Sequence, residues 1–294
     1  MNITRTSFTT RARTWVLVAG LTALLIGIGA ALGGGFLYIF VAFAVIMNLA
    51  GYWFSDKIAI KASRARPLEP EEQPELRRIV TELAGRAGVP VPRLYLIPSE
   101  QPNAFATGRN PKHAAVAVTE GLLHHLPPEQ VRAVLAHEFA HIKNRDILVS
   151  SVAAMIAASI SAIANILQFS FLFGGDDDDN PLGIVGALAT IILAPIAAAL
   201  LQLGVSRQRE YLADATGAKF IGEGRPLADA LETLERGTAA VPMPVNPATA
   251  SLYIANPLRG AGVATLFSTH PPIAERIRRL RALDSATVAA FSTA

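Results

Sequence analysis

The sequence contains no cysteine among its 294 residues. Without cysteine a chain can form neither disulfide bonds nor a thiolate metal site, so any metal must be held by histidine and carboxylate side chains. The sequence also lacks a block of basic residues interleaved with aromatic ones, and its formal net charge is only +3. Together, these absences argue against a disulfide-stabilised protein and against binding of nucleic acid.

Charged residues are scarce as well, at 17% of the chain against 51% hydrophobic residues. The long uncharged stretches are Trp15–Leu32, Phe36–Phe54, Ile147–Phe173 and Leu182–Ser206. Since about 20 apolar residues cross a bilayer as a helix, each stretch is long enough to be a transmembrane candidate. Gly33-Gly34-Gly35 separates the first two stretches, and the aspartate-rich turn 174–181 separates the last two. The sequence therefore predicts a membrane protein with two apolar helical hairpins.

Two alternatives compete with these spans. The first stretch could be a signal peptide, because Arg5, Arg11 and Arg13 precede it, but a second stretch follows at once and no convincing cleavage site is present. The second hairpin could instead be buried inside a soluble domain, since it is rich in alanine and contains serine, Asn165 and Pro195.

Basic residues flank all four spans on one side. They are Arg11, Arg13, Lys57, Lys61, Arg64, Arg66, Lys143, Arg145, Arg207 and Arg209, and neither turn carries any. Because Lys and Arg beside a span mark the cytoplasmic side, we expect both termini and both polar segments to face the cytoplasm.

The alternation of apolar and polar stretches divides the chain into four expected parts. These are an N-terminal transmembrane hairpin (1–55), a first half of a catalytic domain (56–146), a second apolar hairpin (147–205) and a second half of that domain (206–294). Helical periodicity is expected from Leu76 to Ala87, from Pro127 through the 130s, over Ser206–Ile221, over Pro226–Arg236 and from Ile273 to Leu283, whereas Arg93–Ile97 and His113–Val118 are typical of short strands. The stretches Pro98–Pro111 and Gly237–Ser268 are expected to be loops.

The segment His137-Glu138-Phe139-Ala140-His141 carries the strongest chemical signal. On a helix, residues four apart share a face, so His137 and His141 can bind one metal ion while Glu138 lies beside the open coordination position. This is the pattern of zinc hydrolases, although five residues of this kind also recur by chance.

A catalytic zinc ion usually has three protein ligands, so a further carboxylate is expected. Glu210 and Asp214 lie four apart on a predicted helix, where Glu210 can ligate the metal and Asp214 can reach an imidazole N–H. Alternatively, both could lie on a solvated face paired with Arg207 and Arg209. The apolar hairpin between the two motifs would return the chain to the side of the membrane that it left, so the ligands could meet.

In these motifs the chain resembles the HtpX family of membrane-bound zinc endopeptidases, which are relatives of the CAAX prenyl proteases. The resemblance rests on Asn103–Gly108, the HEFAH motif, the apolar hairpins, SRQREYLAD, and THPP followed by Glu275-Arg276-Ile277. It implies one Zn²⁺ per chain bound by His137, His141 and Glu210, with Glu138 as general base and Asp214 supporting a ligand. It also implies a mainly α membrane fold in which a split α+β zincin-like domain with a small sheet faces the cytoplasm of a bacterium.

The resemblance also suggests three weaker assignments. His270 of the THPP motif is a candidate donor to the oxyanion, with Tyr211 as the alternative, although a histidine here could simply cap a helix. Asn103, Ala104 and Phe105 resemble the segment that pairs with an extended substrate, although they could form an ordinary surface turn.

The function expected from the sequence is therefore zinc-dependent hydrolysis of polypeptides at the bacterial plasma membrane. The resemblance implies quality control of misfolded or damaged membrane proteins. Two alternatives stay open: a protease that processes one specific peptide, and a membrane scaffold that binds zinc without catalysis. Intact Glu138 argues against the scaffold, because only catalysis needs the base.

Overall fold

The computed structural model describes residues 35–155, 157, 207–245, 247–258 and 270–283, together with scattered positions between 16 and 30. Most of the first predicted span and of the predicted span 147–173, the aspartate-rich turn and the predicted span 182–206 lie outside the described residues. Within the described part, the chain is mostly helical with one small sheet, as the sequence predicts.

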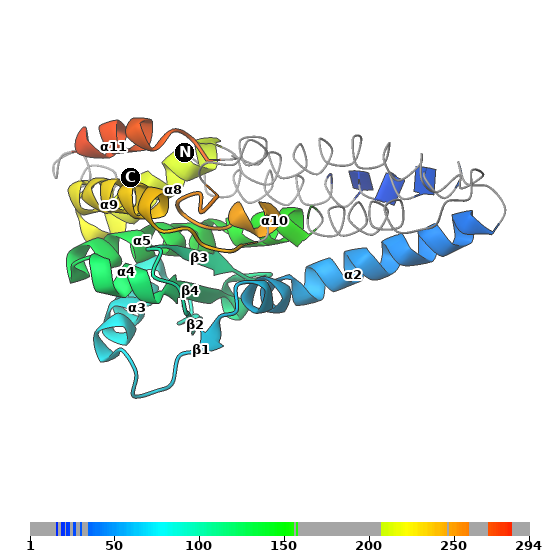
Figure 1. Ribbon diagram of the computed structural model, residues 1–294, viewed down its shortest axis with the longest axis horizontal. Helices are drawn as coiled ribbons and strands as arrows, with labels where there is room; N and C mark the ends of the chain where they lie inside the picture. Colours follow the sequence, from blue (N-terminus) through cyan, green and yellow to red (C-terminus); the bar gives the residue numbers. More distant parts are fainter. Residues whose placement is uncertain are drawn as a thin grey trace.

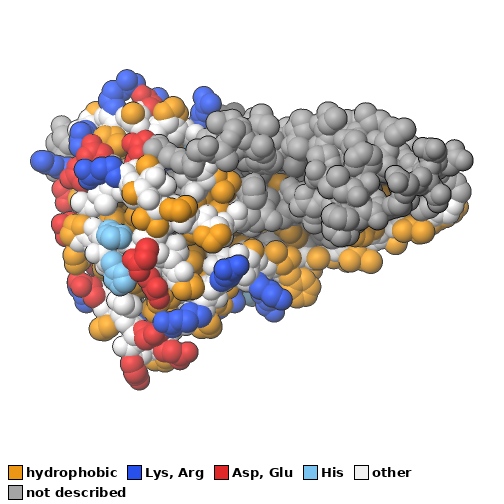
Figure 2. Space-filling view, viewed as in Figure 1, with side chains coloured by type: hydrophobic (Ala, Val, Ile, Leu, Met, Phe, Trp, Pro, Cys, Tyr) orange, Lys and Arg blue, Asp and Glu red, His pale blue; other side chains and the backbone are white. Residues whose placement is uncertain are grey.

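Helix α2 (Phe36–Ala62) contains the second apolar stretch and projects from the folded domain (Figure 1). Its exposed large apolar side chains are Tyr38, Ile39, Val41, Phe43, Val45, Ile46, Leu49, Tyr52, Trp53, Phe54 and Ile58. In the space-filling view, hydrophobic side chains line the visible part of the projecting helix (Figure 2). Among the described residues, no helix has both the length and the apolarity that crossing a bilayer requires, so the predicted transmembrane helices are not confirmed.

The sheet has four strands in the order β1-β2-β4-β3. They are β1 (Arg66–Pro67), β2 (Arg93–Ile97), β3 (Ala104–Thr107) and β4 (Ala115–Thr119). Strands β2 and β4 are parallel, and the other two pairs are antiparallel. The prediction for β2 is confirmed. The predicted strand His113–Val118 begins two residues later, because Pro111–His113 form the 3-10 turn η1, which a proline at its start favours.

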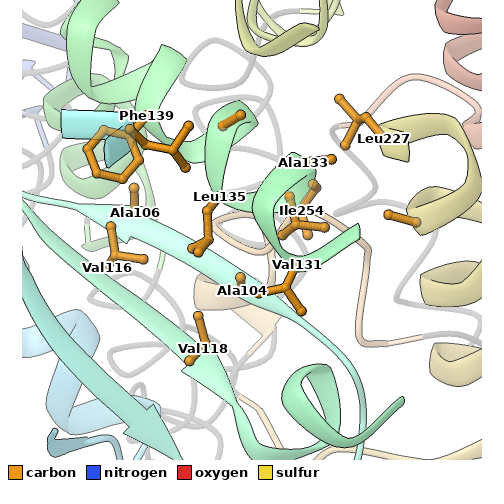
Figure 3. Packing of buried hydrophobic residues seen from close by; sticks show 14 of the residues in the cluster. Ala104, Ala106, Val116, Val118, Val131, Ala133, Leu135, Phe139, Leu227 and Ile254 are labelled. Carbon is orange, nitrogen blue, oxygen red and sulfur yellow. The ribbon is translucent and has the colours of Figure 1, made fainter. Parts of the chain in front are cut away.

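Both faces of the sheet are covered. Successive residues of a strand point to opposite faces, so each strand contributes side chains to two clusters. Ala104, Ala106, Val116 and Val118 pack against Val131, Leu135 and Phe139 (Figure 3). Phe105, Ala117 and Ile97 point the other way, into a second cluster with α2 and the helical residues 146–155. The sheet is therefore a buried central layer that supports the helices on either side.

Seven further helices surround this layer in the described residues. They are α3 (Pro74–Ala87), α4 (Glu120–His125), α5 (Pro128–Asn144), α8 (Arg207–Ile221), α9 (Arg225–Ala240), α10 (Pro247–Ala250) and α11 (Ile273–Arg281). Prolines begin α3 and α5, where a missing N–H costs nothing, and Gly88 ends α3 in the left-handed conformation. The predicted loop 237–268 is partly wrong, because α9 continues to Ala240 and α10 follows.

Candidate metal centre

Helix α5 carries His137, Glu138 and His141 into the interior of the domain. The side chain of His137 is 1% exposed, and Glu138 as a residue is 3% exposed. The Nε2 atoms of the two imidazoles lie 3.2 Å apart on one face of the helix. This spacing confirms that residues four apart on α5 present both ring nitrogens to the same point.

Helix α8 packs against α5 and brings Glu210 to the same point. One carboxylate oxygen, Oε1, lies 3.5 Å from Nε2 of His141, and the other, Oε2, lies 3.6 Å from Nε2 of His137. Glu210 is only 3% exposed, so the alternative of a solvated helix face does not hold for it.

The three side chains fit a divalent metal ion. Ligands bound tetrahedrally at about 2.0–2.1 Å from zinc lie about 3.4 Å from one another. The two Nε2 atoms are 3.2 Å apart, and each lies 3.5 or 3.6 Å from a different oxygen of the Glu210 carboxylate, so the separations are close to that value. In the part of the chain that the structure describes, His137, His141 and Glu210 are the group of side chains able to hold a metal. Two imidazoles and a carboxylate are a donor set that suits zinc.

Each imidazole has a carboxylate at its other nitrogen. Nδ1 of His137 lies 2.9 Å from Asp214, and Nδ1 of His141 lies 3.4 Å from Asp146. A hydrogen bond at Nδ1 keeps the proton there and turns the Nε2 lone pair toward the metal position. Asp146 reaches His141 because Arg145 ends α5 with a left-handed φ of 61°, which turns the chain sharply.

Arg276 is the residue that sequence reasoning missed. It appeared there only as part of a family motif, yet its side chain is fully buried in the site. Its guanidinium donates to both oxygens of Asp214, at 2.9 and 2.7 Å, and to the carbonyl of Ile254 at 3.2 Å. Arg276 therefore holds Asp214 against His137 and balances the negative charge of the buried carboxylates.

Glu138 borders the same small cavity as the three side chains that could hold a metal. That cavity has a volume of about 20 Å³, roughly the space of one water molecule. Residues Ser251, Leu252 and Ile254 form one wall of it, and His270 forms another part. Among the described residues, the cavity is too small to hold a polypeptide.

His270 and Tyr211, the two candidate donors to the oxyanion, lie in different surroundings. Nε2 of His270 donates to the Ser251 carbonyl at 3.2 Å, and Nδ1 lies 3.1 Å from Glu210. His270 is therefore in the site. Tyr211, the alternative donor, has its ring stacked against the Arg279 guanidinium at 3.9 Å.

Asn103, Ala104 and Phe105 are buried rather than part of a surface turn. The Asn103 side chain donates to the Ala255 carbonyl at 2.8 Å, and the Ala104 carbonyl accepts from the backbone N–H of Ile254 at 3.1 Å. Residues of the chain itself thus occupy the edge of β3 at which an extended substrate was expected. That these three residues bind substrate stays a prediction.

Burial and neighbouring charges shift the pKa values of the titratable side chains in the site. Burial raises the pKa of Glu138 to about 8. Burial also opposes the charged form of His141, but its hydrogen bond to Asp146 and the neighbouring carboxylates outweigh this, and its pKa is raised to about 9. The pKa of His137 is lowered to about 4, chiefly by burial. A metal must therefore displace a proton from His141 at neutral pH, whereas His137 is already neutral.

We expect the metal-free protein to lose stability as the pH rises from 6.5 to 8. In this window Glu138 and His141 have pKa values raised above their ordinary ones, so the folded state binds more protons than the unfolded state and the free energy of unfolding falls. The expected slope is on the order of 1 kcal/mol per pH unit. His137, with its lowered pKa, acts in the opposite direction only below pH 6.5. Thermal unfolding of chelator-treated protein measures the effect, and a melting temperature that rises over this range would contradict it.

Gly217 allows α8 to approach α5 directly behind His137. A Cβ atom at this position would lie 2.9 Å from the backbone nitrogen of His137 and 3.0 Å from the carbonyl carbon of Ala136. The backbone of α5 would have to shift to make room for this Cβ atom. Gly217→Ala should therefore lower the free energy of unfolding by about 1–3 kcal/mol and weaken metal binding. Gly85→Ala is the matched control, because nothing lies within 4 Å of a Cβ there. Equal melting temperatures for the two variants would disprove the close packing.

Comparisons with known proteins give one consistent family. The model of "Peptidase family M48" matches residues 70–284. A "Protease HtpX homolog" of Syntrophobacter fumaroxidans is 54% identical over 280 residues, covering 93% of this chain and 99% of the relative. Another, of Pyrococcus furiosus, is 51% identical over 272 residues, covering 92% and 94%.

A solved structure shows the same fold. The crystal structure of S. mikatae Ste24p superposes with a TM-score of 0.50 and 24% sequence identity, covering 94% of this chain and 67% of that chain. At this identity the likeness concerns the fold alone.

Proposed function

The chain belongs to peptidase family M48, and from this membership we propose that it is a membrane-anchored, zinc-dependent endopeptidase. We propose that it hydrolyses misfolded or damaged membrane proteins at the cytoplasmic face of the bacterial plasma membrane. The observation that carries the catalytic part is the convergence of His137, His141 and Glu210, whose ligand atoms all lie within 4.8 Å of one another, with Glu138 beside them.

The proposed chemistry assigns a task to each side chain. When bound, zinc supplies a Lewis acid for the attacking water and the scissile carbonyl. Glu138 accepts the proton of the water and passes it to the leaving amine. Asp214 keeps His137 oriented. His270 is the proposed donor to the developing oxyanion.

Substrate binding at β3 requires a local rearrangement in this proposal. An extended peptide can pair with Ala104 only if the backbone N–H of Ile254 releases its carbonyl. Moving residues 251–255 would also enlarge the cavity beside Glu138. Backbone pairing of this kind tolerates many sequences, as removal of diverse damaged proteins demands.

The proposed anchor is the apolar part of the chain. The exposed apolar side chains of α2 suit contact with lipid, and basic residues flank the uncharged stretches on the side assigned to the cytoplasm. In this arrangement the parts 56–146 and 206–294 form one catalytic domain, and the hairpin 147–205 joins them.

Cleavage of an unstructured protein tests the proposal. Purified protein in detergent should cleave casein, lose this activity after treatment with a chelator, and regain it when one equivalent of zinc is added back. Activity that survives complete metal removal would refute the zinc mechanism. Failure to cleave casein together with cleavage of a single peptide would favour the processing enzyme.

A further inference from the structure

A second cavity lies where α2 meets the folded domain, apart from the metal centre. Its volume is about 510 Å³, within the range of small-ligand sites. Three segments form its walls: Trp53, Phe54, Asp56 and Lys57 of α2, Val91 and Arg93 at the start of β2, and residues 109–114 between β3 and β4. None of these residues takes part in the proposed catalysis.

The charge of this cavity is strongly unbalanced. Lys57, Arg93, Arg109 and Lys112 line it, against the single carboxylate of Asp56. Arg93 already pairs with that carboxylate at 2.6 Å. Among the described residues, no carboxylate pairs with the other three cations. The cavity therefore offers charge-assisted hydrogen bonds to an anion.

Two of the cations, Arg93 and Arg109, are held in place by their surroundings. The Arg109 guanidinium lies over the Trp53 ring, 4.5 Å from its centroid, and the Asp56–Arg93 pair ties α2 to β2. The loop itself depends on Gly108, which has a φ of +137° and where any Cβ would collide with the His113 carbonyl. The residues that line this cavity are thus brought together by the packing of segments that are distant in the chain.

The position of the cavity indicates the kind of anion. It begins where the exposed apolar side chains of α2 give way to charge, beside the neighbouring aromatic residues Tyr52 and Trp53. Such aromatic side chains mark the boundary between hydrocarbon and headgroups, and Lys or Arg beyond it attract anionic lipids. Figure 2 shows basic side chains gathered at the inner end of this apolar surface.

We propose that this cavity binds the phosphate headgroup of an anionic phospholipid whose acyl chains lie along α2. The inference rests on the proposed membrane association, but it requires only contact of α2 with lipid and no particular topology. Bound lipid would hold α2 against β2 and the 109–114 loop. It would thereby fix the orientation of the catalytic domain at the membrane surface.

Quenching of Trp53 fluorescence by brominated lipids tests the proposal. The chain has two tryptophans, so Trp15→Phe leaves Trp53 as the sole reporter. The full chain is reconstituted in phosphatidylcholine vesicles with or without phosphatidylglycerol, and either lipid carries the bromine. We expect Trp53 to select phosphatidylglycerol over phosphatidylcholine, by about fivefold for each cation that contacts it.

The variant Lys112→Gln should reduce this selectivity, and Arg109→Gln/Lys112→Gln should nearly abolish it. Among the described residues, the Lys112 side chain makes no hydrogen bond or ion pair, so its single substitution should leave the fold intact. The control Arg78→Gln/Arg225→Gln removes the same charge from exposed positions outside the cavity and should keep the selectivity.

Three outcomes would overturn the lipid site. They are equal quenching by both lipids, an equal loss of selectivity in the control, and displacement of phosphatidylglycerol by inorganic phosphate at the same concentration, which would indicate a small-anion site. Absence of quenching by either lipid would refute membrane association as well, so the two proposals fail in different ways.

Discussion

Glu138→Ala should lower the rate of casein cleavage by about 10²- to 10⁴-fold while zinc stays bound in full. The carboxylate adjoins a histidine of the proposed ligand set and borders the same cavity, but it is not among the side chains whose donor atoms converge on one point. Its removal therefore deletes the proton acceptor and leaves the proposed ligand set complete. Cleavage assays and metal analysis on the same preparation measure both quantities.

The stability of this variant provides a second readout. Because burial raises the pKa of Glu138, the folded protein bears a cost for its charge at alkaline pH, and the variant should melt no lower than the parent there. Glu75→Ala is the control, since its side chain is 57% exposed on α3. Cleavage by Glu138→Ala at the rate of the parent would end the proposed mechanism.

Glu210→Ala should lose zinc, with an affinity at least about 100-fold weaker. Loss of an outer partner of a ligand alone costs about 10- to 100-fold, and Glu210 is placed to be a ligand, 3.5 and 3.6 Å from the two Nε2 atoms. The substitution also removes a buried acceptor that lies 3.1 Å from Nδ1 of His270. The variant should therefore be both inactive and poor in metal.

Metal content after dialysis measures this prediction, with circular dichroism to establish that the variant is folded. Glu210→Gln keeps the shape of the side chain and tests whether the charge is needed. The control is Glu223→Ala, which removes an exposed carboxylate just after α8. If Glu210→Ala retained stoichiometric zinc, Glu210 would leave the proposed ligand set.

Local features of the fold were predictable because backbone geometry imposes them. Because His137 and His141 are four residues apart, their imidazoles lie on one face of any helix, whatever surrounds it. Likewise, alternating residues and flanking turns located β2, and Pro128 with Glu129 marked the start of α5.

The residue pattern did not indicate strand β3, and only the family resemblance implied an edge strand at Asn103–Gly108. Ala104–Thr107 is a four-residue segment inside a stretch rich in proline, asparagine and glycine, which is typical of a loop. Pairing with β4 and the hydrogen bonds of Asn103 to Ala255 hold it extended. Both interactions depend on how distant segments pack.

Arg276 is the clearest example of a residue whose burial depends on the packing of distant segments. Within α11 it resembles Arg278 and Arg279, whose side chains are 77% and 56% exposed, yet it is fully buried. A periodic pattern identifies helical faces, but only the packing of α11 against α8 and α9 decides which face loses water.

The sequence by itself determined the chemical groups of the centre and the helices that carry them, because these follow from composition and from the helical repeat. Tertiary structure alone decided that Arg276 would balance the buried carboxylates, that Ser251, Leu252 and Ile254 would line the cavity beside Glu138, and that four cations would line one cavity with Trp53. Burial and Coulomb interactions depend on distances between segments remote in the chain, and those distances exist only once the chain has folded.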